Sequence, residues 1–241
     1  MSASPRVVSL VPSVTETLLA WGVTPVACTR FCEQPGLRHV GGTKNPDVPA
    51  IVDLAPDVVV MCVEENRRED AEALGAAGVR TVALSIDGVD DVRPALRTLA
   101  GVVGLDAVGL GLDDAAWATG GGGADPAAAL AVSVFVPIWK RPWMTMSDGT
   151  YGSSLLAALG ARNVFADAAD RYPTVTLDEA RERRPDLVLA PSEPYPFGQR
   201  HVPALEEVAP VVLVDGQDLF WWGARTPGAM RRLRDRLASA R

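Results

Sequence analysis

Long apolar runs, basic residues and histidines are all scarce in this chain of 241 residues. No run of 18 apolar residues occurs, so the sequence predicts no membrane-spanning helix. The 23 basic residues are outnumbered by 30 acidic ones, giving a formal net charge of −7. A surface that follows nucleic-acid phosphates needs an excess of Lys and Arg, so we expect no nucleic-acid partner. The apolar fraction of 48% is that of an ordinary globular protein.

Common enzyme motifs are missing as well. The sequence contains no GxSxG, no GxxxxGK[ST] and no HExxH. With only two histidines, His39 and His201, a nucleophilic serine has few candidate bases. The sequence therefore predicts a protein that is not an enzyme.

The cysteines and the N-terminus bear on the cellular compartment. The three cysteines, Cys28, Cys32 and Cys62, cannot all pair, and so small a number fits a reducing compartment. The first residues lack the basic start and long apolar stretch of a secretory signal. We therefore expect a cytoplasmic location, with a periplasmic or extracellular one only if a leader precedes this sequence.

A metal site is not expected. Cys28 and Cys32 lack the second closely spaced pair that structural zinc sites use. His39 is near them in the sequence, whereas Cys62 and His201 would have to come from elsewhere in the fold. We expect buried, unreactive thiols, no bound metal and no cofactor.

Short apolar runs alternate with helical patterns along the chain, which predicts an α/β fold. The DVVVMC run is almost wholly apolar, as in a parallel strand that is buried on both faces. Strands are predicted over 6–11, 24–29, 57–62, 79–85, 131–138, 186–191 and 210–215. Helices are predicted over 14–22, 66–78, 90–104, 151–164, 176–185, 202–208 and 226–241.

The middle of the chain divides this pattern into two lobes. It contains GLGLDD and the run GGGG at 120–123, which are typical of a linker. The predicted organisation is an N-terminal α/β lobe at 1–104, a connecting segment at 105–130, a C-terminal α/β lobe at 131–215, and a cleft loop with a terminal helix at 216–241.

The two lobes resemble each other in sequence. LLAWG at 18–22 matches LLAALG at 155–160, and Pro56-Asp57 matches Pro185-Asp186. Glu64 and Glu193 follow these dipeptides at the same offset. The matches favour an internal duplication, although short α/β repeats of common composition would produce similar ones. We predict two Rossmann-like lobes with parallel sheets, whose strand ends face one cleft.

Aromatic residues and arginines gather after predicted strands. Flat, rigid aromatic rings suit a large planar or apolar ligand, and a neighbouring guanidinium suits an anionic group. Packing beneath long loops and solvated arginines are the alternative explanations. The residues concerned are Phe31, Trp139, Trp143, Tyr195, Phe197, Trp221 and Trp222, with Arg30, Arg141 and Arg225.

Four segments resemble a known family, the class III solute-binding proteins, which include cobalamin-binding and ferric-siderophore-binding receptors. These segments are RVVSLVPSVTETLLAWG at 6–22, VGGTKNPDVPAIVDLAPDVVVM at 40–61, WKRPWMTMSDGTYGSSLLAALGARNVF at 139–165 and PDLVLAPSEPYPF at 185–197. The similarity is greatest to a subgroup described as helical-backbone metal receptors.

The resemblance implies a corrinoid or another bulky metal chelate, such as a ferric siderophore, held between the lobes. It also implies a monomer, with an ABC importer as partner if the protein is exported. An enzyme on the same fold acting on a tetrapyrrole or siderophore-like substrate is the main alternative, and a module that binds a protein segment is another. The positions that match the family's ligand site are Pro12, Ser13, Thr15, Glu16, Arg30, Phe31, Trp139, Trp143, Met144, Glu193, Tyr195, Phe197, Trp221, Trp222 and Arg225.

Overall fold

A computed structural model describes residues 5–112 and 130–240 of the chain. These residues form two compact units. The first contains residues 5–86, 90–112 and 222–224, and the second contains residues 87–89, 130–221 and 225–240. The prediction of two α/β lobes is confirmed. Most of the predicted connecting segment, 105–130, lies outside the described residues, so its boundaries stay a prediction.

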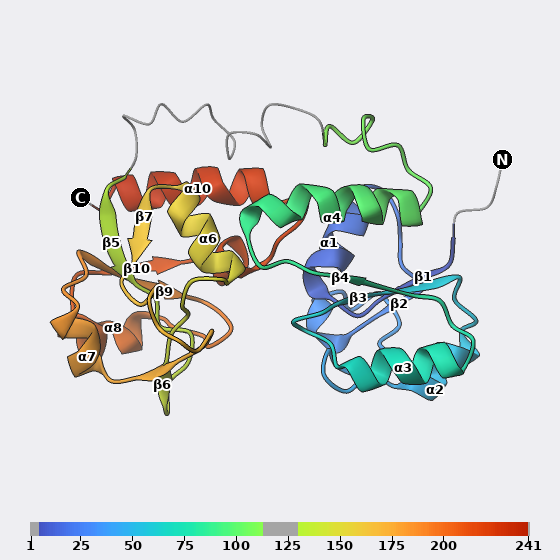
Figure 1. Ribbon diagram of the computed structural model, residues 1–241, viewed down its shortest axis with the longest axis horizontal. Helices are drawn as coiled ribbons and strands as arrows, with labels where there is room; N and C mark the ends of the chain where they lie inside the picture. Colours follow the sequence, from blue (N-terminus) through green and yellow to red (C-terminus); the bar gives the residue numbers. More distant parts are fainter. Residues whose placement is uncertain (1–4, 113–129, 241) are drawn as a thin grey trace. The chain divides into compact units, whose positions relative to one another are not determined.

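The first unit is built on a parallel sheet with the strand order β2-β1-β3-β4. In Figure 1, α1 and α4 cover one face of this sheet and α2 and α3 cover the other. The strands are β1 (Val7–Ser9), β2 (Ala27–Cys28), β3 (Val58–Cys62) and β4 (Thr81–Leu84). The helices are α1 (Pro12–Ala20), α2 (Val48–Asp53), α3 (Arg68–Ala76) and α4 (Val89–Val102), with a 3₁₀ turn, η1, at Arg30–Cys32.

The second unit has a parallel sheet with the order β10-β9-β5-β7. Its strands are β5 (Val132–Phe135), β7 (Ala161–Asn163), β9 (Leu187–Pro191) and β10 (Val211–Val214), and a separate antiparallel pair joins β6 (Trp143–Met144) to β8 (Thr174–Val175). Its helices are α6 (Tyr151–Ala158), α7 (Leu177–Glu182), α8 (Val202–Leu205), α9 (Gly216–Phe220) and α10 (Thr226–Ala238), with a 3₁₀ turn, η3, at Gln199–His201.

Both main sheets follow the same path. In each, the first strand is central, the second lies outside it, and the third and fourth follow on the other side, which is the order 2-1-3-4. This order puts the first helix on one face and the next two on the other, as right-handed crossovers require. The shared topology supports the duplication that the sequence matches suggest.

An aspartate clamps the central strand pair of each sheet. The Asp57 carboxylate accepts the Arg6 backbone N–H at 2.6 Å, and the Asp57 N–H donates to the Arg6 carbonyl at 2.9 Å. In the second sheet the Asp186 carboxylate accepts the backbone N–H and the hydroxyl of Ser133, each at 2.7 Å. The repeated Pro-Asp dipeptide therefore fixes the register of the third strand against the first.

The apolar strands form the core of each unit. All five residues of β3 and all five of β9 are buried, as expected for central parallel strands covered on both faces. Helix α4 adds a stripe of buried apolar residues on one side, with the spacing of an amphipathic helix. Within the described residues, the search for a helix long and apolar enough to cross a membrane finds none.

The two units differ between the first strand and the first helix. In the first unit only Leu10 and Val11 separate β1 from α1. In the second, residues 136–150 separate β5 from α6 and include β6. We call residues 136–150 the β5–α6 excursion. Its residues from Trp139 onward belong to the segment at 139–165 that resembles the class III solute-binding proteins.

One predicted helix is wrong in part. The helix expected over 151–164 ends at Ala158, because Gly160 takes the left-handed conformation (φ 78°) that stops a helix. Residues Ala161–Asn163 then form β7 beside β5. Helices α2 and α9 were not predicted. Each begins after an aspartate whose side chain accepts a backbone N–H of the first turn, Asp47 for α2 and Asp215 for α9.

The segment Trp222–Ala224 belongs to the first unit although it comes late in the sequence. The Thr17 hydroxyl on α1 accepts the Ala224 backbone N–H at 3.1 Å and donates to the Ser13 carbonyl at 2.8 Å. Gly223 has a positive φ of 134°, and a Cβ there would overlap the Thr17 hydroxyl. Only glycine fits at this position without moving the segment.

We expect Gly223→Ala to lower the free energy of unfolding by about 2–4 kcal/mol, since it combines backbone strain with a steric overlap. Urea denaturation followed by circular dichroism measures this loss. The control is Gly36→Ala, because a Cβ on Gly36 meets nothing within 4 Å. Equal stabilities of the two variants would show that residue 223 is not packed against α1.

Candidate ligand-binding site

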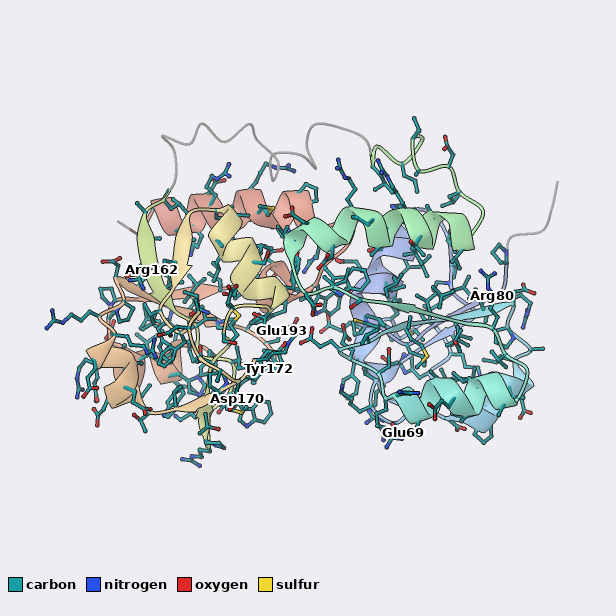
Figure 2. The ribbon with its side chains drawn as sticks, in the orientation of Figure 1. Glu69, Arg80, Arg162, Asp170, Tyr172 and Glu193 are labelled. Atoms are coloured by element: carbon teal, nitrogen blue, oxygen red, sulfur yellow. The ribbon has the colours of Figure 1, made fainter. Side chains whose placement is uncertain are left out.

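Ligands of open α/β sheets bind beyond the carboxyl ends of the strands. In the second unit, two segments at this edge carry six of the predicted site residues: the β5–α6 excursion and the segment after β9. In Figure 2, Tyr172 and Asp170, which precede β8, lie on the β6 side of this unit, and Arg162 on β7 lies away from it.

Four aromatic side chains from these two segments contact one another. We call Trp139, Trp143, Tyr195 and Phe197 the aromatic platform. Trp143 stacks on Phe197, with ring centroids 6.0 Å apart and planes 6° from parallel. The Trp139 and Tyr195 rings meet edge to face at 5.5 Å, and Tyr195 lies 4.8 Å from Phe197. The structure therefore brings together four predicted residues from segments about 50 positions apart.

The four residues of the aromatic platform differ in their exposure to solvent. Trp139 is 43% exposed, whereas Phe197 is 6% exposed. Trp143 and Tyr195 are half-buried. Trp139 therefore keeps exposed ring surface, and the buried Phe197 packs against Tyr195 and Trp143.

The backbone holds Trp139 in a tight hairpin. The Ile138 N–H donates to the Met144 carbonyl at 2.8 Å, and the Met144 N–H donates to the Trp139 carbonyl at 3.2 Å. Strand β6 pairs with β8 on its other side. The Lys140 Nζ lies 5.4 Å from the centre of the Trp143 ring, within range of a cation–π interaction. Met144, a predicted site residue, thus forms both backbone hydrogen bonds of the hairpin, and the residue is half-buried.

The segment after β9 is fixed from both ends. The Phe197 N–H donates to the Tyr195 carbonyl at 2.8 Å, closing a tight turn. The Ser192 hydroxyl accepts the Gly216 N–H at 2.9 Å. A Cβ on Gly216 would overlap Glu193, so glycine is required where α9 begins. Glu193 itself is half-buried in this contact.

His201 packs behind the platform and was not predicted as a site residue. Its ring meets the rings of Tyr195 and Phe197 edge to face, each at 5.4 Å, and it is 4% exposed. Its Nδ1 accepts the Gly198 N–H at 3.1 Å. Burial, and then the charges of Arg200 and Lys140, hold the pKa of His201 below its usual value. The proline-rich segment 191–197 ends four residues before His201, and its sequence gives no signal that the two are in contact.

Arg225 and Trp221 lie at another part of the second unit. The Arg225 guanidinium is 5.6 Å from the centre of the Trp221 ring, and its Nη1 is 3.8 Å from the buried Asp218 carboxylate. Arg232 binds the same carboxylate through two hydrogen bonds of 2.6 and 2.7 Å. The predicted pairing of an arginine with a tryptophan is therefore present. Arg141, the third arginine of the sequence analysis, is exposed on the hairpin.

In the first unit, Arg30 and Phe31 lie in η1, directly after β2. The Arg30 guanidinium lies 4.8 Å from the centre of the Phe31 ring, and Phe31 is 51% exposed. A Cβ on Gly42 would come within 3.0 Å of Arg30 and 3.1 Å of Phe31. This close approach of the loop leaves Phe31 as an exposed ring at the carboxyl edge of the first sheet.

The four predicted residues on α1 have mixed surroundings. Thr15 is fully buried, and its hydroxyl lies 2.8 Å from the Ser9 hydroxyl and 3.2 Å from the Cys32 sulfur. Pro12 and Glu16 are half-buried. Ser13 is buried, and its hydroxyl has no hydrogen-bond partner in the described part of the chain. Thr15 thus has a structural role, which its position in the motif did not reveal.

Asn66 is a second residue that sequence reasoning missed. Its side-chain oxygen accepts the Cys62 N–H at 2.8 Å, and its amide nitrogen donates to the carbonyls of Leu10 and Thr43 at 3.3 and 2.9 Å. It therefore ties together the segments that follow β1 and β3 and the loop near Lys44. The Lys44 ammonium adds a bond to the Glu64 carbonyl at 2.7 Å.

Trp222 lies apart from the aromatic platform. It is 3% exposed and belongs to the first unit, whereas Trp221 beside it belongs to the second. Its burial is typical of a core residue. A role of Trp222 in ligand binding, like the whole set of site residues, stays a prediction.

The cysteines are buried thiols without disulfide bonds. Burial, followed by the nearby Cys32, raises the pKa of Cys28 to about 12, and burial with nearby Glu65 raises that of Cys62 to about 11. Among the described residues, no group of three or more His, Cys, Asp or Glu side chains is placed to hold a metal ion.

The fold and the edge-of-sheet site define a two-lobe α/β binding protein. The model of one family, described as periplasmic binding protein, matches residues 7–209. The chain belongs to the periplasmic binding protein family. This confirms the family resemblance of the sequence motifs. The family consists of solute-binding proteins, which are not enzymes.

Several known proteins are similar to this chain. The vitamin B12-binding protein of Salmonella choleraesuis is 25% identical over 196 residues, covering 78% of this chain and 72% of that protein. Among solved structures, the periplasmic vitamin B12 binding protein BtuF of Vibrio cholerae has a TM-score of 0.78 at 20% identity and covers 98% of both chains. The periplasmic heme-binding protein BhuT, in complex with two hemes, has a TM-score of 0.81 at 22% identity and covers 99% of both.

The predicted cytoplasmic location is wrong. Family membership and the B12-binding relatives point to the periplasm. The prediction depended on a small cysteine count and on the residues at the start of the sequence, and neither feature identifies the compartment by itself.

The raised cysteine pKa values predict slow thiol chemistry. Only the thiolate reacts rapidly with Ellman's reagent, and at pH 8 about one Cys62 thiol in a thousand is ionised when its pKa is about 11. We expect the native protein to react over hours and the urea-denatured protein to release three equivalents within minutes. Rapid reaction of three thiols in the native protein would contradict the burial of Cys28 and Cys62.

Proposed function

We propose that the protein binds a corrinoid or another bulky metal chelate, and that the aromatic platform forms one wall of the binding site. The main observation in support of this proposal is the geometry of the platform: Trp139 is 43% exposed on a hairpin that backbone hydrogen bonds hold in place. A rigid aromatic surface loses little conformational entropy on binding, and it suits a ligand with a large planar ring system.

The relatives support this ligand class. Proteins named for vitamin B12 are similar over most of the chain, and solved structures named for B12 and for heme share its fold. Both ligands are large macrocycles that hold a metal ion. The alternative of an enzyme on this fold has no motif in its favour.

The other predicted site residues extend the proposal. Exposed Phe31, with the Arg30 guanidinium beside it, would offer the ligand a ring and a positive charge. Arg225 next to Trp221 would do the same in the second unit. A location in the periplasm and delivery of the ligand to an ABC importer follow from the same family membership, and we propose both.

Trp139→Ala should weaken chelate binding and leave stability nearly unchanged. Truncation of an aromatic anchor costs about 2 kcal/mol, or roughly 30-fold in affinity. The measurement is quenching of tryptophan fluorescence during titration with cyanocobalamin, ferric heme and a ferric siderophore, with thermal melts alongside.

Trp222→Ala is the comparison, since the Trp222 ring is buried and its role in ligand binding is itself a prediction. Because Trp222 is 3% exposed, its truncation should cost stability, by about 3–5 kcal/mol, through the cavity it leaves. An unchanged affinity in Trp139→Ala would exclude the platform as a binding wall. If none of the three chelates binds the wild type at tens of micromolar, the proposed ligand class is wrong.

A further inference from the structure

His201 is placed to sense pH behind the proposed binding surface. The chain has only two histidines, and His39 is exposed whereas His201 is 4% exposed. The imidazole of His201 touches both Tyr195 and Phe197 edge to face. Any movement of this ring therefore changes the support of two of the four platform residues.

The hydrogen bonds of His201 require a neutral ring. Both ring nitrogens face a donor, the Gly198 N–H at 3.1 Å from Nδ1 and the Arg200 Nε–H from Nε2, so a neutral ring can accept one of the two bonds and a protonated ring can accept neither. The Arg200 Nε lies 3.3 Å from Nε2. An imidazolium has an N–H at both nitrogens, so it could not accept from Gly198. Its Nδ1–H would need another acceptor, such as the carbonyl oxygen of Gly198.

The charges around His201 also disfavour protonation. The charged groups that face it are Arg200 on η3 and Lys140 on the hairpin, and both are cationic. Burial acts in the same direction and is the largest contribution to the lowered pKa. A hydrogen bond from the protonated ring to the Gly198 backbone would raise the pKa, and burial with the two cations outweighs it.

We propose that protonation of His201 loosens the aromatic platform, so that ligand binding weakens in mildly acid solution. The effect on ligand binding rests on the proposed function, whereas the loosening itself does not.

The direction of the pH effect follows from the linkage between protonation of His201 and closure of the platform. An opened platform gives His201 its ordinary pKa near 6.5, whereas the closed platform holds a lower one. The closed form is therefore fully favoured above pH 6.5, and it loses stability as the pH falls below that value. A ligand that needs the closed platform binds more weakly over the same range. Each unit of pKa difference between the free and bound protein corresponds to about a tenfold change in affinity.

The first measurement needs no ligand. Near-UV circular dichroism reports the packing of the platform rings, and the imidazole proton signals in NMR report the protonation of the two histidines. Between pH 7.5 and 4.5, we expect the wild-type near-UV signal to fall in step with the titration of His201. His39→Gln should behave like the wild type.

Two variants separate the charge from the packing. His201→Phe keeps an aromatic ring against Tyr195 and Phe197 and cannot be protonated. His201→Asn keeps an oxygen that can accept the Gly198 N–H and also carries no charge. We expect at least one of them to retain the near-UV signal of pH 7.5 and to keep it down to pH 4.5. If both variants lose the signal with pH as the wild type does, the proposal is wrong.

The second measurement is affinity. Whichever of cyanocobalamin, ferric heme and the ferric siderophore binds at pH 7.5 should bind the wild type about tenfold more weakly at pH 5.0. The non-titrating variant should lose much less, and equal losses would overturn the link to ligand binding. If no chelate binds at pH 7.5, the proposed function fails, and the near-UV titration still decides whether His201 controls the platform.

Discussion

Each unit depends on the pairing of its first and third strands, which an aspartate fixes. Asp57 binds the backbone at Arg6, and Asp186 binds the backbone and hydroxyl of Ser133. Because the strands are parallel, this one register places every strand end of a sheet at the same edge. The loops after these ends, including η1 in the first unit and the aromatic platform in the second, take their positions from that edge. A slip of one residue would turn the buried side chains of the third strand to the opposite faces.

Much of the fold could be predicted from periodicity and composition. The apolar runs that became β3 and β9 were clear because central parallel strands are buried on both faces. The sequence repeat of Pro56-Asp57 and Pro185-Asp186 proved to be a repeated hydrogen-bonding device. Strand β7 was missed because only three residues follow Gly160 before the strand ends, too few for a periodic signal. The internal repeat also indicates this strand, since β2 follows the corresponding Gly22.

The candidate site was only partly predictable. The sequence pattern shows which residues follow a strand, but it does not show how their side chains pack. The clustering of Trp139, Trp143, Tyr195 and Phe197 follows from the strand order, which places β5 beside β9. The support from His201 and the crosslink by Asn66 depend on side-chain directions inside loops. Residues that are adjacent in the sequence can also belong to different units: Trp221 lies in the second unit and Trp222 in the first.

The β5–α6 excursion has a consequence for how such a protein diversifies. It enters from one end of β5 and returns at α6, and the corresponding connection in the first unit needs only two residues, Leu10 and Val11. The sheet can therefore be completed with or without it. Changes in the length and chemistry of this insertion can therefore alter the proposed binding surface while leaving intact the strand pairing that folds the unit.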